Sequence, residues 1–101
     1  MAESNGDIVY LNVGGIYYVT RYSTLSESDS FFSAFVRNNS GCLPSELFID
    51  RDPTHFRYIL NWLRGVKHLP DNDDILKELL WEADYFCMTQ MSEAIKRTKN
   101  R

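Results

Sequence analysis

Residues 48–64 read FIDRDPTHFRYILNWLR, which places an Asp-Arg-Asp cluster and a proline directly before a run of aromatic and aliphatic side chains. Such a cluster fits two interpretations: a metal or acid-catalytic site, or a capped helix that leads into an interaction surface. Asp52 precedes Pro53, and proline suits the first helical position while disfavouring a helical conformation for the residue before it. Asp52 is therefore predicted to be the N-cap of a helix, where its carboxylate accepts a free backbone N–H.

The helix after Pro53 is predicted to be apolar on more than one side. Its main apolar stripe recurs at helical spacing and should face the core. Tyr58 and Trp62, four residues apart, lie on a different flank that needs a partner, and Gly65 marks the end of the helix. The core stripe consists of Phe56, Ile59, Leu60 and Leu63.

Two runs rich in strand-forming residues precede this stretch, at 8–13 (IVYLNV) and 16–20 (IYYVT). Gly14-Gly15 joins them, and glycine supplies the positive φ angles of a tight turn, so a β-hairpin is predicted. Alternation places Val9, Leu11 and Val13 on one face. Because the other face is not fully polar either, we expect the sheet to be covered on both sides, at least in part.

The remaining elements follow from capping signals and periodicity. Thr24 to Glu27 has the spacing of a capping box and predicts a helix over 29–37. The other predicted elements are a loop at 38–45, a third strand at 47–49, an amphipathic helix over 75–83 and a last helix capped by Thr89. The fold class is therefore α+β, with a small three-stranded sheet, an N-terminal β-hairpin and about five helices.

Length and composition indicate one compact globular domain. The chain has 101 residues, of which 44% are hydrophobic and 25% charged. No apolar run is long enough to cross a bilayer, and residues 1–7 lack the apolar core of a signal peptide. Cys42 and Cys87 have no disulfide-framework spacing, which favours a reducing compartment. We expect a cytoplasmic protein without direct membrane contact.

The charges are unevenly distributed along the chain. Residues 71–84 carry six acidic side chains against Lys77, a net of −5, and residues 91–101 carry a net of +3. Two solvated helix faces would explain this pattern, and so would complementary patches that meet on another copy of the chain. The overall charge of −3 opposes nucleic-acid binding, which depends on clustered positive charge.

Catalytic groups are sparse. Neither His55 nor His68 is brought near Cys42 by any motif, Cys87 reads as a small buried hydrophobe, and Gly14-Gly15 lacks the lysine of a phosphate loop. The sequence predicts no enzyme, no cofactor and no catalytic or metal-binding residue.

Five short motifs, in order and in register from about Asp7 to Ile95, carry a family resemblance. The chain resembles a BTB/T1 domain, the fold of the tetramerisation domains of voltage-gated potassium channels and of the KCTD proteins. Leu63-Arg64 and EADYF look closer to the KCTD branch. The motifs are LNVGG at 11–15, Thr20 with Thr24-Leu25, FIDRDP at 48–53, ILNWLR at 59–64 and EADYF at 82–86.

The resemblance implies a BTB/POZ (T1-like) domain at residues 7–97, with flexible ends at 1–6 and 98–101. It implies a closed ring of identical subunits, four or five with five favoured, and in many relatives recruitment of the cullin-3 ubiquitin-ligase scaffold. The alternative is the cytoplasmic tetramerisation domain of a potassium-channel subunit. Some channel T1 domains bind zinc through one His and three Cys, but His68 lacks the following Cys and Met88 follows Cys87.

We favour an interaction module over a monomer whose aromatic side chains all lie in the core. One small core seldom buries so many tyrosine and tryptophan side chains, which are enriched at interfaces. The predicted oligomer-interface residues are Asp50, Arg51, Asp52, Arg57, Tyr58, Trp62, Arg64, Asp73 and Asp74. The predicted partner-binding residues, around a polar loop with Leu43 as a solvent-facing anchor, are Asn38, Asn39, Leu43, Tyr85 and Met88.

Overall fold

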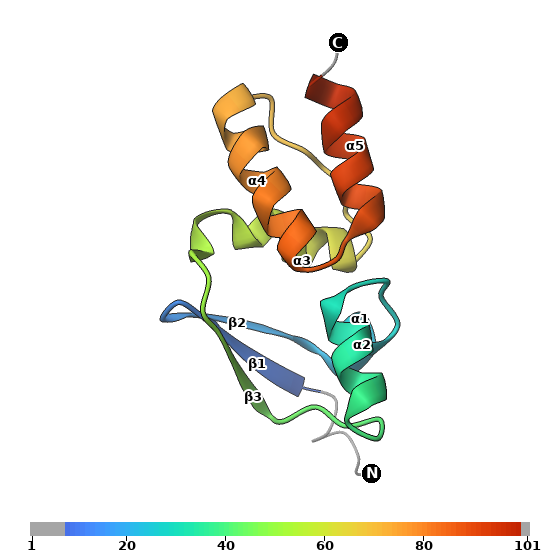
Figure 1. Ribbon diagram of the computed structural model, residues 1–101. Coiled ribbons are helices and arrows are strands. Elements are labelled where there is room, and N and C mark those ends of the chain that lie inside the picture. The colour runs from blue at the N-terminus through green and yellow to red at the C-terminus, as the bar shows by residue number, and fades with distance from the viewer. Residues whose placement is uncertain (1–7, 100–101) are drawn as a thin grey trace.

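The computed structural model of the protein describes residues 8–99 and confirms the α+β class (Figure 1). Its elements are β1 (Ile8–Val13), β2 (Ile16–Arg21), α1 (Tyr22–Ser26), α2 (Phe31–Asn38), β3 (Glu46–Ile49), a 3₁₀ helix η2 (Pro53–His55), α3 (Phe56–Leu63), α4 (Asp73–Tyr85) and α5 (Thr89–Lys99). Residues 1–6 and 100–101, predicted to be flexible, lie outside the described part. Helix α5 continues two residues past the predicted domain end at 97.

The sheet has the strand order β2-β1-β3. Strands β1 and β2 form the predicted antiparallel hairpin, and β3 joins β1 in parallel. Gly14 and Gly15 have φ angles of +56° and +102°, which only glycine adopts readily. A Cβ atom on Gly14 would also lie 2.4 Å from the carbonyl oxygen of Arg51. The hairpin turn therefore packs directly against the segment that leaves β3.

Within residues 8–99, the helices cover only one face of the sheet. Val9, Leu11 and Val13 are at most 2% exposed, and they form the core with the helices. Cross-strand partners share a face, so the register puts the intervening residues together on the other side. Its large apolar members, which we name the open sheet face, are Ile8, Tyr10, Tyr17, Val19 and Phe48, with exposed fractions of 39, 46, 55, 45 and 61%. The expected covering of both faces is thus wrong for the described residues of the single chain.

The helices form a second layer that continues away from the sheet. Helices α4 and α5 lie side by side, α3 lies between them and the sheet, and α1 and α2 lie beside the sheet (Figure 1). Phe86, just after α4, joins these parts. Its ring stacks on Phe32 of α2 and meets Phe56 of α3 edge-on, with both centroid distances 5.5 Å. One continuous core results.

The start of α2 corrects one prediction. Thr24 and Glu27 lie in and just after the short helix α1, so they are not the capping box of the next helix. Ser30 is the N-cap instead: its hydroxyl accepts the N–H of Phe32, and the Ser33 hydroxyl accepts the N–H of Ser30. The box belongs there because Ser30 has an extended backbone directly before the first residues that pack into the core.

Candidate interaction surfaces

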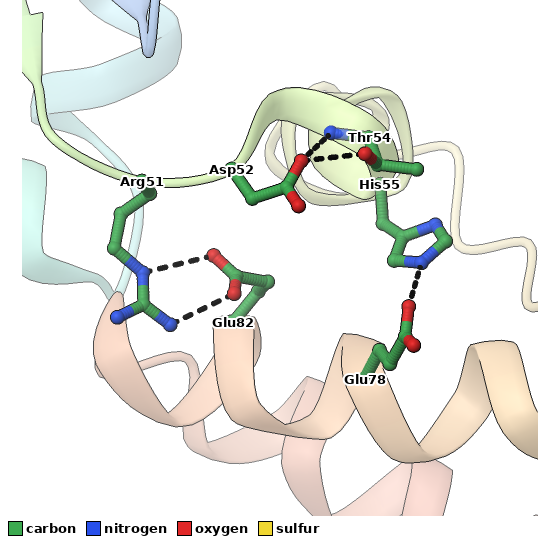
Figure 2. Close-up of polar contacts among 6 residues, drawn as sticks. All are labelled: Arg51, Asp52, Thr54, His55, Glu78 and Glu82. Atoms are coloured by element: carbon green, nitrogen blue, oxygen red, sulfur yellow. Dashed lines mark hydrogen bonds and ion pairs between the residues drawn. The ribbon is translucent and has the colours of Figure 1, made fainter.

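Asp52 is the predicted helix cap. Its carboxylate accepts the backbone N–H of Thr54 at 2.9 Å and also the Thr54 hydroxyl, and Pro53 begins η2 (Figure 2). Both hydrogen bonds from Thr54 lower the pKa of Asp52, and the bond from the hydroxyl has the larger effect. Of the two interpretations of the Asp-Arg-Asp cluster, the capped helix is therefore confirmed for Asp52.

Arg51 is engaged within the chain. Its guanidinium donates to both carboxylate oxygens of Glu82, at 3.1 and 2.8 Å (Figure 2). The guanidinium also lies 4.3 Å from the ring centroid of Tyr85. The hydrogen bonds to Glu82 raise the pKa of Arg51. One helical turn away, His55 Nε2 lies 2.7 Å from a carboxylate oxygen of Glu78. Both acidic side chains come from α4 and hold the segment that joins β3 to α3.

Three of the six acidic side chains in segment 71–84 form hydrogen bonds or ion pairs inside the chain. Besides Glu78 and Glu82, Asp84 accepts a hydrogen bond of 2.7 Å from the hydroxyl of Ser92. Asp73 and Asp74 are exposed in the first turn of α4, where negative charge complements the helix dipole. Half of the acidic side chains of this segment thus have partners inside the chain, whereas Asp71, Asp73 and Asp74 are exposed.

A second aromatic surface lies along α3. Tyr58 is half-buried, with its ring stacked on His68 at 6.3 Å and the Arg57 guanidinium 5.6 Å from its centroid. Trp62, also half-buried, has the ammonium of Lys67 5.8 Å from its ring. We name these five residues the α3 flank. Arg57, Lys67 and His68 are exposed, so the flank combines aromatic surface with positive charge.

An open pocket of about 260 Å³ lies beside Trp62. Leu63, Lys67 and Met91 contribute to its wall, together with residues before α2 and at the start of α5. Arg64, predicted at the interface, instead donates a hydrogen bond of 2.7 Å to the backbone carbonyl of Val19 on strand β2. Arg64 thus ties the end of α3 to the sheet.

The predicted partner-binding residues do not form one exposed patch. Asn38 and Asn39 are exposed at the end of α2, and Tyr85 is 45% exposed. Leu43 is half-buried against the core, so its prediction as a solvent-facing anchor is wrong. Met88 is only 2% exposed and belongs to the core, and it contributes to the wall of the pocket beside Trp62 rather than to an exposed patch with Tyr85.

The open sheet face was absent from the predicted interface residues. The signal for it was in the sequence, since Ile8, Tyr10, Tyr17 and Val19 alternate with the residues of the buried face. Alternation alone could not show that none of the helices between residues 8 and 99 covers that side. That information depends on the placement of the helices, which is long-range.

Comparison with known proteins identifies the family. A family profile described as the BTB/POZ domain matches residues 9–95. The chain is 41% identical over 100 residues to FH protein interacting protein FIP2 of Arabidopsis thaliana, a match covering 91% of the chain and 33% of that protein. It is 40% identical over 90 residues to SH3KBP1-binding protein 1 of Bos taurus, covering 85% and 13%. It is 39% identical over 94 residues to human BTB/POZ domain-containing protein KCTD3, covering 89% and 11%.

These relatives are longer than the chain, which spans a third or less of each. None of the helices within residues 8–99 has the length and apolar character needed to cross a membrane. The predicted resemblance is confirmed, including the KCTD-type relatives. The chain belongs to the BTB/POZ family of protein-interaction domains.

Proposed function

We propose that this domain associates with itself and serves as the assembly module of a cullin-3 ubiquitin-ligase adaptor. The open sheet face is the observation that carries the self-association. Tyr10, Tyr17 and Phe48 each expose about half of their surface on one flat side of the sheet. Contiguous apolar surface of this kind on a small domain marks an interaction site, because water is excluded from it only when a partner covers it.

The predicted ring has four or five subunits, with five favoured by the KCTD-like features. A closed ring needs two unlike surfaces on each subunit. Asp50, Arg57, Tyr58 and Trp62 remain at least partly accessible for such a contact. Arg51 and Arg64 have partners inside the chain, so we assign them to holding the loop and α3 rather than to the contact itself.

Light scattering coupled to gel filtration tests the self-association. At tens of micromolar, roughly the range of a weak protein interaction, we expect a single species of four or five times the monomer mass. Phe48→Asp should reduce that mass, because a charge replaces the most exposed ring of the open sheet face. A parent protein that elutes as a clean monomer at this concentration contradicts the proposal.

The adaptor role is supported by the relatives and by two exposed positions. Two of the three relatives named above carry names that describe binding to another protein, which favours an adaptor over a channel subunit. Asn38 and Tyr85 offer accessible polar and aromatic surface at the ends of α2 and α4. Tyr85 also contacts Phe31, with ring centroids 6.4 Å apart, which places the end of α4 near the start of α2, whereas Asn38 lies at the other end of that helix.

A calorimetric titration with the N-terminal region of cullin-3 tests this role. We expect heat with the parent and weaker binding by Asn38→Arg and by Tyr85→Ala. Leu43 is unsuitable for this test, because a charge at this half-buried position would disturb the core. Lys96→Glu, an exposed change on α5, is the control and should bind like the parent. No heat with a folded parent would discard the ligase role; undiminished binding by both variants would discard this surface alone.

A further inference from the structure

We propose that the open sheet face of one copy docks on the α3 flank of a second copy, so that each subunit contributes one surface to each neighbour. This inference rests on the proposed self-association and names the two surfaces that meet. Both carry aromatic side chains that the core does not fully use. The described residues form one continuous core within a single chain, and both surfaces lie at its outside.

The two surfaces cannot meet within one chain. Tyr18 lies on the covered face of β2, opposite buried Leu11. Its ring lies 4.9 Å from that of Phe56 at the start of α3, and its hydroxyl donates to the carbonyl of Pro53. Helix α3 therefore packs on the covered side of the sheet, while the open sheet face points the other way. Contact between them must come from a different molecule, and it is necessarily head-to-tail.

Charge favours this pairing over contact between two identical faces. Glu46 shares a row with Tyr10 on the open sheet face, where the Tyr17 hydroxyl donates to it at 2.9 Å. Asp50 follows β3 and is exposed. Arg21 is the one basic residue in these rows, and it lies at the far end beside Ile8. The α3 flank presents Arg57 and Lys67, so acidic β3 meets a basic surface, whereas contact between two open sheet faces would leave Glu46 and Asp50 with Arg21 as the one basic partner in these rows.

The exposed rings can form the centre of such an interface, and their shape suits the same pairing. Aromatic side chains bury roughly 150–250 Å² each, so the three half-exposed rings of the open sheet face hold about 300 Å². A stable interface needs about 800 Å² per partner, and the surrounding residues must supply the remainder. Phe48 is the most exposed of these rings, at 61%, and the pocket of about 260 Å³ beside Trp62 is a concave feature at the α3 flank that can receive a ring.

A mixing experiment tests the pairing. One protein carries Phe48→Asp, which damages the sheet surface and leaves the flank intact. The other carries Arg57→Glu with Lys67→Glu, which reverses the flank and leaves the sheet intact. Both flank positions are exposed and away from the core, and Tyr58→Ser serves as a second flank variant. Controls with matched charge changes are Trp81→Asp on α4 and Arg37→Glu with Lys96→Glu, all exposed positions.

Each surface variant alone should raise the midpoint concentration of assembly by roughly tenfold or more, as expected for the loss of a central contact. An equal mixture should give a one-to-one dimer, because each pair retains one intact sheet face and one intact flank. The control variants should assemble like the parent. An assembled parent whose mixed variants stay monomeric, or whose variants assemble normally, overturns the pairing alone. A monomeric parent overturns the self-association and the pairing with it.

Discussion

Arg51 and Glu82, 31 residues apart in the sequence, are joined by two parallel hydrogen bonds of 3.1 and 2.8 Å (Figure 2). The arginine belongs to the segment between β3 and α3, and the carboxylate belongs to α4. Their side chains are 29% and 14% exposed, so water screens the pair only in part. The pair therefore fastens the exit of the sheet to the helical layer.

Replacing Arg51 with alanine should destabilise the domain by about 1–3 kcal/mol, because Glu82 keeps its charge at a largely buried position without a donor. Arg51→Lys should recover only part of this loss, since an ammonium cannot donate to both oxygens in the fork geometry. Urea unfolding of the two variants measures the effect. Arg37→Ala, on an exposed basic residue, is the control and should cost little; an equal cost for Arg37→Ala and Arg51→Ala would contradict the assignment.

Gly14→Ala should destabilise the domain more than Gly15→Ala. Both glycines have positive φ angles, for which an L-residue costs roughly 1–2 kcal/mol. Only at Gly14 would the new methyl group also meet the carbonyl oxygen of Arg51, whereas the space around Gly15 is open. Thermal unfolding of both variants gives the comparison. Similar melting temperatures would show that the turn can move away from the Arg51 segment without loss.

Local signals in the sequence predicted most of the elements. Asp52-Pro53 identified a helix start because capping involves only neighbouring residues, and Gly14-Gly15 identified the turn because only glycine suits those φ angles. Two sequence patterns before α2 resemble a capping box. The predicted one, Thr24 with Glu27, has the acidic residue that is usual at its fourth position, whereas the structure uses Ser30 with Ser33. Ser30 is the cap because it directly precedes the first helical turn that packs into the core.

The candidate surfaces were harder to predict, because they depend on contacts between distant segments. Arg51 reads as a surface charge until α4 brings Glu82 to it. Met88 and Leu43 read as accessible until the packing of the helices buries them wholly or in part. The open sheet face exists because the described helices cover only the opposite side of the sheet. Periodicity identifies a face, and tertiary packing decides whether that face meets water.

The stability provided by Asp52 should depend on pH. Hydrogen bonds from Thr54 lower the pKa of Asp52 in the folded state relative to the unfolded chain. A lowered pKa means that the ionised carboxylate stabilises the fold above the unfolded-state pKa, and that this stabilisation disappears as the pH falls through the folded-state pKa. Asp52→Ala should therefore be less stable than the parent at neutral pH, and the two should converge in acid below the usual aspartate range. Urea unfolding across that range measures the difference, with Asp50→Ala as the charge-matched neighbour. A gap between Asp52→Ala and the parent that stays constant into strong acid would contradict the capping role of the carboxylate.

Self-association should weaken in sodium chloride, and the structure narrows the groups responsible. Of the basic residues in the predicted oligomer interface, Arg51 and Arg64 are bound within the chain, which leaves Arg57, and Lys67 joins it on the α3 flank. Exposed ion pairs contribute about 0–1 kcal/mol each and are screened beyond about 10 Å at 0.1 M salt. Two such pairs per contact should raise the midpoint concentration of assembly by roughly fivefold between low and molar salt. Light scattering at a series of protein concentrations measures that midpoint. In Arg57→Glu with Lys67→Glu, salt should instead promote assembly, because it screens a repulsion from Glu46 and Asp50 of the neighbour. If salt changes the midpoint of neither protein, the contact is held by apolar surface alone and the charges at Arg57 and Lys67 face solvent.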